Sequence, residues 1–328
     1  MVLPPHKNNF NLLRLILASM VVYSHSFALL GLEEPTVWGR GLGTIAVHGF
    51  FTISGYLICQ SFMRASGVGA YAWRRTLRIL PGLVGAIIFS KAVAHFFSDF
   101  EGNPVPFINN GPIWTIPWEV ACYAVLAVVG LLGSLNRYSM PAVLVTAWLV
   151  YLSNLSSVSE GYAAIAPLGL MFVAGAYIFV LKEFINLRVA AGVSFVCLLI
   201  AAFPPLVTVL SGVVRTHLTF LWGPVLNDPQ VVYLFYLAAL PFLMIYICND
   251  LPCVVQLRDD VSYGVYLYGW PLAQSLIALA GVRQWTQLPF FLVTMLILLP
   301  IAFFSWRAVE RPALRLKNFQ FSLSRQLR

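Results

Sequence analysis

Runs of about 20 apolar residues recur along the chain, and they constrain its fold more than any other feature, because a helix needs about 20 such residues to cross a bilayer. Short polar breaks separate the runs. The sequence therefore predicts an all-α fold, a polytopic integral membrane helix bundle with about ten transmembrane helices. With boundary errors of a few residues, the predicted spans are 12–31, 44–63, 80–98, 113–132, 140–156, 163–181, 189–210, 230–248, 262–281 and 289–306.

Composition agrees with a membrane protein, because 60% of the 328 residues are hydrophobic and only 10% are charged. Soluble domains usually carry about 25% charged residues. No shift in composition divides the chain, and the polar segments between the spans, such as 99–112 and 211–229, are short. We therefore expect a single transmembrane domain over residues 1–317 and a basic cytoplasmic tail at 318–328, without an appended soluble enzyme domain.

The net charge of +8 raises the question of a nucleic-acid partner, so the positions of the Lys and Arg residues matter. Successive loops between the predicted spans alternate between rich and poor in basic residues. The poor loops hold only Arg40, Arg215 and Arg283. By the positive-inside rule the rich loops face the cytoplasm. This places both termini in the cytoplasm and makes the charge a signal of orientation, with no nucleic acid implied.

The five cysteines lie mostly in apolar spans, and no CxxC pair or Cys/His ligand spacing is present. We therefore expect neither a disulfide framework nor a metal site. The cysteines are Cys59, Cys122, Cys197, Cys248 and Cys253.

Titratable side chains inside the predicted spans are functional candidates, because such groups are costly at membrane depth unless paired or solvated. Counted from Gly31 and Pro112 at the outer ends of their spans, His25 and Glu119 each lie about 10 Å deep. His48 is slightly shallower. A carboxylate in the same layer would orient His25 as a general base. The alternative is that these groups only join helices or face a water-filled vestibule.

A basic cluster, Arg74, Arg75 and Arg78, precedes the third predicted span. Arginine binds phosphate oxygens in a bidentate manner, although arginines in a cytoplasmic loop can also serve orientation or lipid contact. Arg14 begins the first span, and eleven residues of helix carry the chain about 16 Å from there to His25. A ligand with a phosphate-rich end and a long thin reactive arm, such as coenzyme A, fits that separation.

Several short motifs occur in a specific order along nearly the whole chain. They are Arg14 and His25 separated by ten residues, HGFFTISGYLI at 48–58, Arg75 and Arg78 before Ile79, NGPIWTIPWE at 110–119 with Tyr123, SYGVYLYGWP at 262–271, and Glu310-Arg311-Pro312. In this order and at these spacings the chain resembles the acyltransferase-3 family of membrane-bound O-acyltransferases.

The resemblance implies transfer of an acyl group, usually acetyl, from cytosolic acyl-CoA to a hydroxyl of a saccharide, which can be an exopolysaccharide, a lipopolysaccharide or a lipid-linked glycan. We also expect the protein to lie in the bacterial inner membrane. By the same analogy His25 is the catalytic histidine and Glu119 supports it. The arginines expected to bind the CoA end are Arg14, Arg74, Arg75 and Arg78. One departure is Gly269, where many relatives carry histidine.

Contacts with the acceptor are expected from His48 and from aromatic side chains at the outer mouth of the predicted site. Aromatic residues at the membrane interface, however, are ordinarily membrane-belt residues. These aromatic candidates are Trp114, Trp118 and Tyr123. Ser54 and Gly55 are expected to allow close helix packing, since no Gly-x-Ser-x-Gly turn surrounds Ser54.

Two mechanisms and one main rival class remain open from the sequence, besides a purely structural membrane subunit, which the buried titratable residues disfavour. His25 can act as the general base in a direct transfer, or it can form a transient acyl-histidine. The rival is a proton-coupled transporter or flippase, in which His25 and Glu119 would form a proton relay. The lack of a convincing internal repeat and the phosphate-suited arginine pair disfavour this rival.

Overall fold

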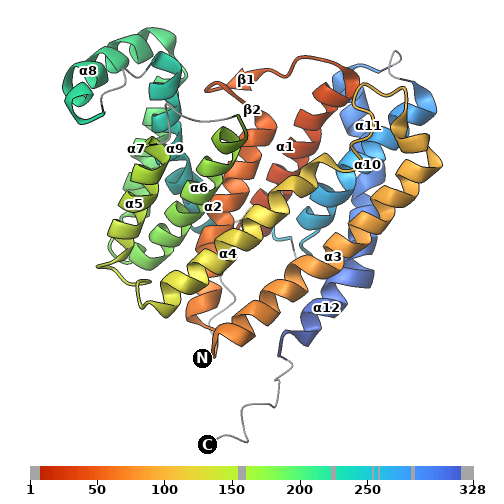
Figure 1. Cartoon of the computed structure of the whole chain (residues 1–328), viewed down its shortest axis with the longest axis horizontal. Helices are drawn as coiled ribbons and strands as arrows, with labels where there is room; N and C mark the ends of the chain where they lie inside the picture. The colour runs from red at the N-terminus through yellow and green to blue at the C-terminus, as the bar shows by residue number, and fades with distance from the viewer. Residues whose placement is uncertain are drawn as a thin grey trace, which may run out of the picture. The chain divides into compact units, whose positions relative to one another are not determined.

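The computed structural model describes residues 8–153, 160–222, 227–252, 255–257, 259–281 and 285–318. Cys253, Arg283 and residues 319–328 of the predicted tail lie outside these residues. The fold is helical (Figure 1), and the described strands, β1 (Thr36–Val37) and β2 (Arg40–Gly41), form one small antiparallel hairpin. The long helices are α1 (Phe10–Leu30), α2 (Leu42–Met63), α3 (Val68–Phe96), α4 (Ile116–Leu131), α5 (Met140–Ser153), α6 (Glu160–Leu181), α7 (Leu187–Ala201), α8 (Pro204–Trp222), α9 (Asp228–Asn249), α10 (Ser262–Ala280) and α11 (Gln287–Ser305).

Shorter helical segments complete the described part of the chain. They are η1 (Ser98–Phe100), η2 (Gly111–Thr115), the π-helical turn η4 (Trp306–Glu310), α12 (Arg311–Arg315) and η5 (Leu316–Asn318).

Every predicted span has a helical counterpart, and the predicted class of polytopic membrane helix bundle is confirmed. Within the described residues, seven helical segments are long and apolar enough to cross a membrane, or up to eight if the bent pair of α7 and α8 forms one span. Helix α5 is apolar but shorter, and α10 falls outside the set. The seven segments are Phe10–Leu30, Leu42–Met63, Val68–Phe96, Gly111–Leu131, Ala164–Leu181, Asp228–Asn249 and Gln287–Arg315.

The predicted span at 189–210 and the predicted loop at 211–229 are wrong in detail. Helix α7 ends at Ala201, and α8 starts at Pro204 after a bend of 98° and continues through much of the predicted loop. Proline lacks the backbone N–H and clashes with the preceding turn, so Pro204 and Pro205 end one helix and suit the first turn of the next.

Helix α3 begins at Val68, twelve residues before the span predicted from residue 80. Hydropathy misses this part because it carries arginines, which the aqueous end of a membrane helix tolerates. Arg74, Arg75 and Arg78 therefore lie on the first turns of α3 itself.

The chain forms two compact units that share helices. Unit 1 comprises Met1–Ser24, Glu34–Gln60 and Thr115–Leu257, and unit 2 comprises His25–Glu33, Ser61–Trp114 and Arg258–Arg328. The boundary crosses α1 and α2, so the units are not consecutive domains of the sequence.

In unit 1, α6 packs against α4, α5 and α9, and α7 packs against α9. Helices α2 and α6 approach each other closely through two glycines. A Cβ atom on Gly55 would lie 1.9 Å from the carbonyl oxygen of Phe172, and one on Gly175 would lie 2.0 Å from that of Thr52. The expected packing role of Gly55 is thus confirmed, since only glycine permits such contact.

In unit 2, α10 packs against α3 and α11, and its residues from Ser262 to Ser275 are all buried. A cluster of hydrophobic side chains packs around the C-terminal half of this helix; its buried members are Leu29, Leu30, Trp270, Ala273, Ile277 and Phe290. Helix α12 packs on α3, and the indole of Trp73 donates a hydrogen bond to the carbonyl of Leu316.

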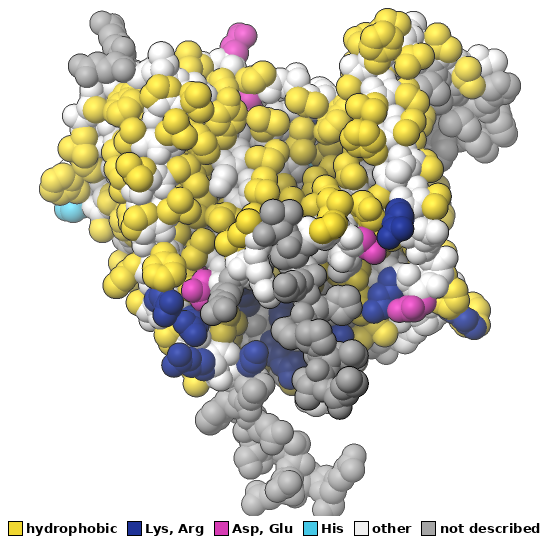
Figure 2. All heavy atoms as spheres, turned by 180° about the vertical axis from the view of Figure 1, so that it is seen from behind, with side chains coloured by type: hydrophobic (Ala, Val, Ile, Leu, Met, Phe, Trp, Pro, Cys, Tyr) yellow, Lys and Arg dark blue, Asp and Glu magenta, His cyan; other side chains and the backbone are white. Residues whose placement is uncertain are grey.

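Large hydrophobic side chains are exposed along the helices of both units. In Figure 2 they cover most of the visible face, and the Lys and Arg side chains gather away from the main hydrophobic area. Soluble monomers rarely expose apolar patches of this extent, which mark surfaces covered by lipid.

Candidate functional site

His25 lies near the end of α1, where its ring packs edge-on against Trp270 of α10. The ring centroids are 5.0 Å apart, with an angle of 84° between the ring planes. The indole nitrogen of Trp270 donates a hydrogen bond of 2.8 Å to the carbonyl of Ile108. Gly111 also lies against this indole, because a Cβ atom on Gly111 would come within 3.0 Å of the ring. His25 is thus placed beside a tryptophan that is itself held by two other contacts.

The segment between α3 and α4 is fixed to α10 by side-chain hydrogen bonds. The amide nitrogen of Asn103 donates to the side-chain oxygen of Gln274 at 2.7 Å, and the amide nitrogen of Gln274 donates to the carbonyl of Val105 at 2.6 Å. Asn110 donates to the carbonyl of Leu267 at 2.8 Å. Two motifs that lie far apart in the sequence, around Asn110 and in α10, are therefore bonded to each other beside His25.

Glu119 lies on the first turn of α4, in unit 1. One of its carboxylate oxygens accepts hydrogen bonds from the hydroxyl of Tyr123, one turn along the helix, and from that of Ser54 in α2 at 3.3 Å. Glu119 and Tyr123 are thus brought together, and Ser54 joins them. Because His25 belongs to unit 2, its pairing with Glu119 stays a prediction.

His48 is buried in α2, among aromatic side chains of unit 1. Its Nδ1 atom forms a hydrogen bond of 2.8 Å with the hydroxyl of Tyr236, and its ring also neighbours that of Tyr233. The guanidinium carbon of Arg40 lies 3.8 Å from the centroid of the Tyr233 ring, in a cation–π contact. His48 therefore belongs to a polar and aromatic cluster that the sequence did not reveal.

Arg78 forms an ion pair with Asp260, the residue that precedes α10 by two positions. Their side chains are 16% and 10% exposed. Asp260 also accepts a hydrogen bond from the hydroxyl of Ser262, and the Arg78 guanidinium lies 5.9 Å from the ring centroids of both Tyr263 and Trp306. The charge of Arg78 is thus balanced within the protein.

The other predicted donor-side arginines have different surroundings. Arg75 lies one turn before Arg78 and donates a hydrogen bond of 3.3 Å to the hydroxyl of Ser61, whereas Arg74 is half-buried beside it. Arg14 lies in unit 1, five residues after Asn9, whose side chain and backbone form hydrogen bonds to carbonyls at the end of α9.

The two predicted tryptophans at the outer mouth are partly exposed, Trp114 at 46% and Trp118 at 39%. Trp118 lines a cavity between α4, α5 and α6, whereas Trp114 lies in η2. Both positions suit either a ligand contact or a membrane belt.

Comparison with known proteins decides the family. The sequence matches the family model of an acyltransferase domain, acyltransferase-3, over residues 7–307. It is 27% identical over 351 residues to the O-acetyl transferase of Shigella phage Sf6, covering 97% of this chain and 99% of that protein. It is 26% identical over 372 residues to Nodulation protein 10 of Rhizobium leguminosarum bv. viciae, with 95% of each chain covered.

The chain belongs to the acyltransferase-3 family. Its predicted activity class, O-acyltransferase, is thereby confirmed. No solved structure matches the sequence. Among the described residues of this acyltransferase, no group of three or more His, Cys, Asp or Glu side chains could hold a metal ion.

Three neighbours of the candidate residues were missed by sequence reasoning: Asp260 beside Arg78, Trp270 beside His25, and Arg40 near His48. Trp270 belongs to a motif that the sequence singles out, but nothing in that motif points to His25. Asp260 carries a weak signal, since Asp259 and Asp260 form an acidic pair directly before a predicted span.

Proposed function

We propose that this acyltransferase moves an acetyl group from cytosolic acetyl-CoA, or a related acyl group from its CoA ester, to a hydroxyl of a saccharide. The acceptor is an exopolysaccharide, a lipopolysaccharide or another glycan, and the protein works in the bacterial inner membrane. The observation that carries the proposal is the placement of His25 against Trp270, in an acyltransferase whose nearby segment is fixed to α10.

In the proposed step, a ring nitrogen of neutral His25 takes the proton of the acceptor hydroxyl while the hydroxyl oxygen attacks the thioester carbonyl carbon. The ester C–O bond forms and the C–S bond breaks. The proton then passes from His25 to the CoA thiolate, which leaves as the thiol. A transient acyl-histidine is the two-step form of the same transfer.

Glu119 is assigned the supporting role of orienting His25 or stabilising its charged form. The hydrogen bonds from Tyr123 and Ser54 favour this role, because they fix the direction of the carboxylate before any substrate binds. A carboxylate already held in position stabilises the positive charge that develops on His25 without the cost of reorganisation.

The CoA phosphates are assigned to the arginines on the cytoplasmic side: Arg14, Arg74, Arg75 and Arg78. Arg74 and Arg75 are the principal phosphate ligands in this assignment, because Arg78 already pairs with Asp260. A phosphate at Arg78 would have to share the guanidinium with that carboxylate. The acceptor saccharide is assigned to His48, Trp114, Trp118 and Tyr123.

The proposal is tested with purified protein, acetyl-CoA labelled in the acetyl group, and an envelope or exopolysaccharide fraction. His25→Ala should lower transfer about 10²–10⁴-fold, the usual contribution of a general acid–base group. The matched control is His95→Ala, which removes an exposed histidine near the end of α3. Equal transfer by wild type and His25→Ala would defeat the assignment, and sugar movement without transfer would favour a transporter.

A further inference from the structure

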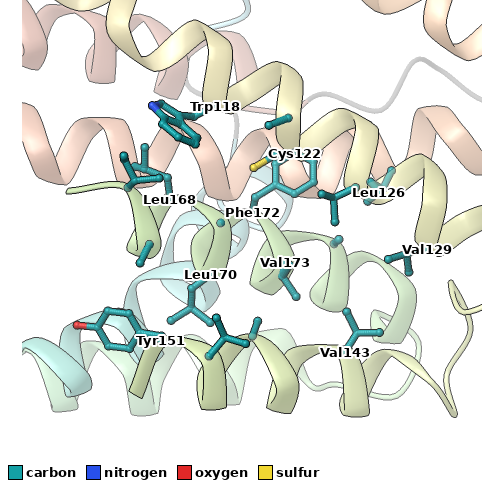
Figure 3. A pocket seen from close by; sticks show the side chains of 18 of the residues that line it. Trp118, Cys122, Leu126, Val129, Val143, Tyr151, Leu168, Leu170, Phe172 and Val173 are labelled. Carbon is teal, nitrogen blue, oxygen red and sulfur yellow. The ribbon is translucent and has the colours of Figure 1, made fainter. Parts of the chain in front are cut away.

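A long cavity of about 350 Å³ runs between α4, α5 and α6 in unit 1. Figure 3 shows its lining side chains, which are nearly all apolar. Trp118, Tyr151 and Leu168 lie toward one end, and Val129 and Val143 lie toward the other. Apolar cavities stay dry, so hydrocarbon fills this space more readily than water does.

The dimensions of the cavity match a lipid chain within one leaflet. Trp118 and Val129 both line it from α4, and the eleven residue steps from one to the other correspond to about 16 Å of helix. This is close to half of a hydrocarbon core of about 30 Å. The end at Trp118 is the start of α4, which the alternation of basic loops places on the outer side.

A cationic group lies near the outer end of the cavity, separated from its lining by one aromatic ring. Tyr151, which lines that end, packs against Tyr233 with ring centroids 6.4 Å apart. Arg40 stacks over the same Tyr233 ring at 3.8 Å. The hairpin that carries Arg40 is fixed in place, because the indole of Trp38 donates a hydrogen bond of 2.9 Å to the carbonyl of Leu198.

The stacked arrangement leaves Arg40 suited to an anion. Stacking uses the face of the guanidinium plane, whereas its N–H groups point outward along the edge, where they match phosphate oxygens. Among the described side chains, no carboxylate forms an ion pair with Arg40. The charge at this end and the apolar cavity together are complementary to one amphiphile, a hydrocarbon chain that ends in a phosphate.

We propose that unit 1 binds the lipid anchor of a lipid-linked saccharide acceptor, with its hydrocarbon chain in the α4–α6 cavity and its phosphate at Arg40. The identity of the ligand as the acceptor rests on the proposed function, whereas the binding of a phosphate-bearing chain does not. The site would hold the saccharide at the outer surface beside the start of α4, where Trp118 and Glu119 lie.

The binding is tested on the full chain in maltoside detergent, with hexadecyl phosphate that carries a photoreactive diazirine in its chain. Labelled peptides should come from α4, α5 and α6. Unlabelled hexadecyl phosphate should displace the probe at least ten times better than hexadecanol or inorganic phosphate. Equal displacement by hexadecanol, or labelling elsewhere only, would overturn the proposal. Equal displacement by phosphatidylglycerol would assign the cavity to bulk phospholipid and also overturn it.

Matched variants separate the two halves of the site. Gly169→Leu should fill the cavity, because a Cβ atom at Gly169 meets nothing within 4 Å and Gly169 lines the space. Arg40→Gln should remove the phosphate partner. Each should reduce labelling at least tenfold, whereas the controls Gly192→Leu and Arg188→Gln, at exposed positions of α7, should not. Undiminished labelling in either test variant would contradict the site.

A transfer assay then links the site to the acceptor. Gly169→Leu should lower acetylation of an alkyl-phosphate-linked saccharide at least tenfold and leave acetylation of the same saccharide without its lipid unchanged. Equal loss on both acceptors would overturn the anchor role. If the wild type acetylates neither, the proposed function fails while the labelling result still decides the lipid site.

Discussion

Helix α10 and the α4–α6 helices are packed in opposite ways. In unit 2, α10 is buried from Ser262 to Ser275, and its polar side chains bond to neighbouring backbone: Tyr263 to the carbonyl of Ile79 and Tyr266 to that of Pro112. In unit 1, the facing surfaces of α4, α5 and α6 are apolar and enclose a cavity of about 350 Å³.

The difference has a physical cause and a functional consequence. Directional hydrogen bonds fix the spacing of helices in a membrane, whereas apolar surfaces there gain little over contact with lipid. A helix held like α10 can keep a reactive side chain that packs against it, such as His25 of α1, in one orientation. A loosely joined group such as α4–α6 can admit a hydrocarbon chain between its members.

The largest expected effect comes from breaking the ion pair at the start of α10. Asp260→Ala leaves the mostly buried Arg78 without its carboxylate and should lower the free energy of unfolding by about 3–5 kcal/mol. Denaturant or thermal unfolding in detergent measures this loss. The double variant Arg78→Met/Asp260→Leu should recover much of it. A loss below about 1 kcal/mol, typical of an exposed pair, would show that this end of α10 is not tightly held.

A smaller loss is expected where α2 and α6 meet. Gly55→Ala places a methyl group 1.9 Å from a backbone oxygen of α6, so the helices must separate, at a cost of about 1–3 kcal/mol. Gly192→Ala, where the added methyl meets nothing within 4 Å, serves as the control. Equal stability of the two variants would show that unit 1 is loose throughout and not only around the cavity.

The hydrogen bonds between α10 and the segment before α4 should make a smaller contribution to the free energy of unfolding. Asn103→Ala leaves the buried Gln274 side chain without one partner and should cost about 1–2 kcal/mol. Hydrogen exchange should rise in the segment around Asn103 and Ile108 and stay unchanged in α5. Unaltered exchange in that segment would mean that these bonds do not hold it.

The smallest expected change in stability is a gain rather than a loss. Gly169→Ala adds a methyl group into open space and improves helix propensity, so it should stabilise the protein by about 0.5–1 kcal/mol. Thermal unfolding of Gly169→Ala is measured in parallel with that of Gly55→Ala, and the two changes in stability are compared. Destabilisation by Gly169→Ala would mean that the cavity is filled by protein.

Sequence reasoning succeeded where a property is local. Runs of apolar residues predict membrane helices because the bilayer demands about 20 of them together, so each predicted span has a helix. It failed at the boundaries that depend on single residues, as at Pro204, and at the arginine-bearing start of α3, which hydropathy does not detect.

The surroundings of the candidate residues could not be predicted, because the contacts join residues far apart in the chain. Arg78 and Asp260 are 182 positions apart, and His48 and Tyr236 are 188. Depth along a helix suggested a layer containing His25 and Glu119, but depth does not tell which way a side chain faces. For the same reason Trp270 was not expected beside His25.

A double-mutant cycle of the acyl-transfer rate, with His25→Ala, Glu119→Gln and the two combined, tests the central claim most directly. Residues that act as one unit show strongly non-additive losses. We predict that the double variant loses no more activity than His25→Ala alone. If the two single losses instead multiply in the double variant, Glu119 does not act through His25, and the account of the catalytic pair is contradicted.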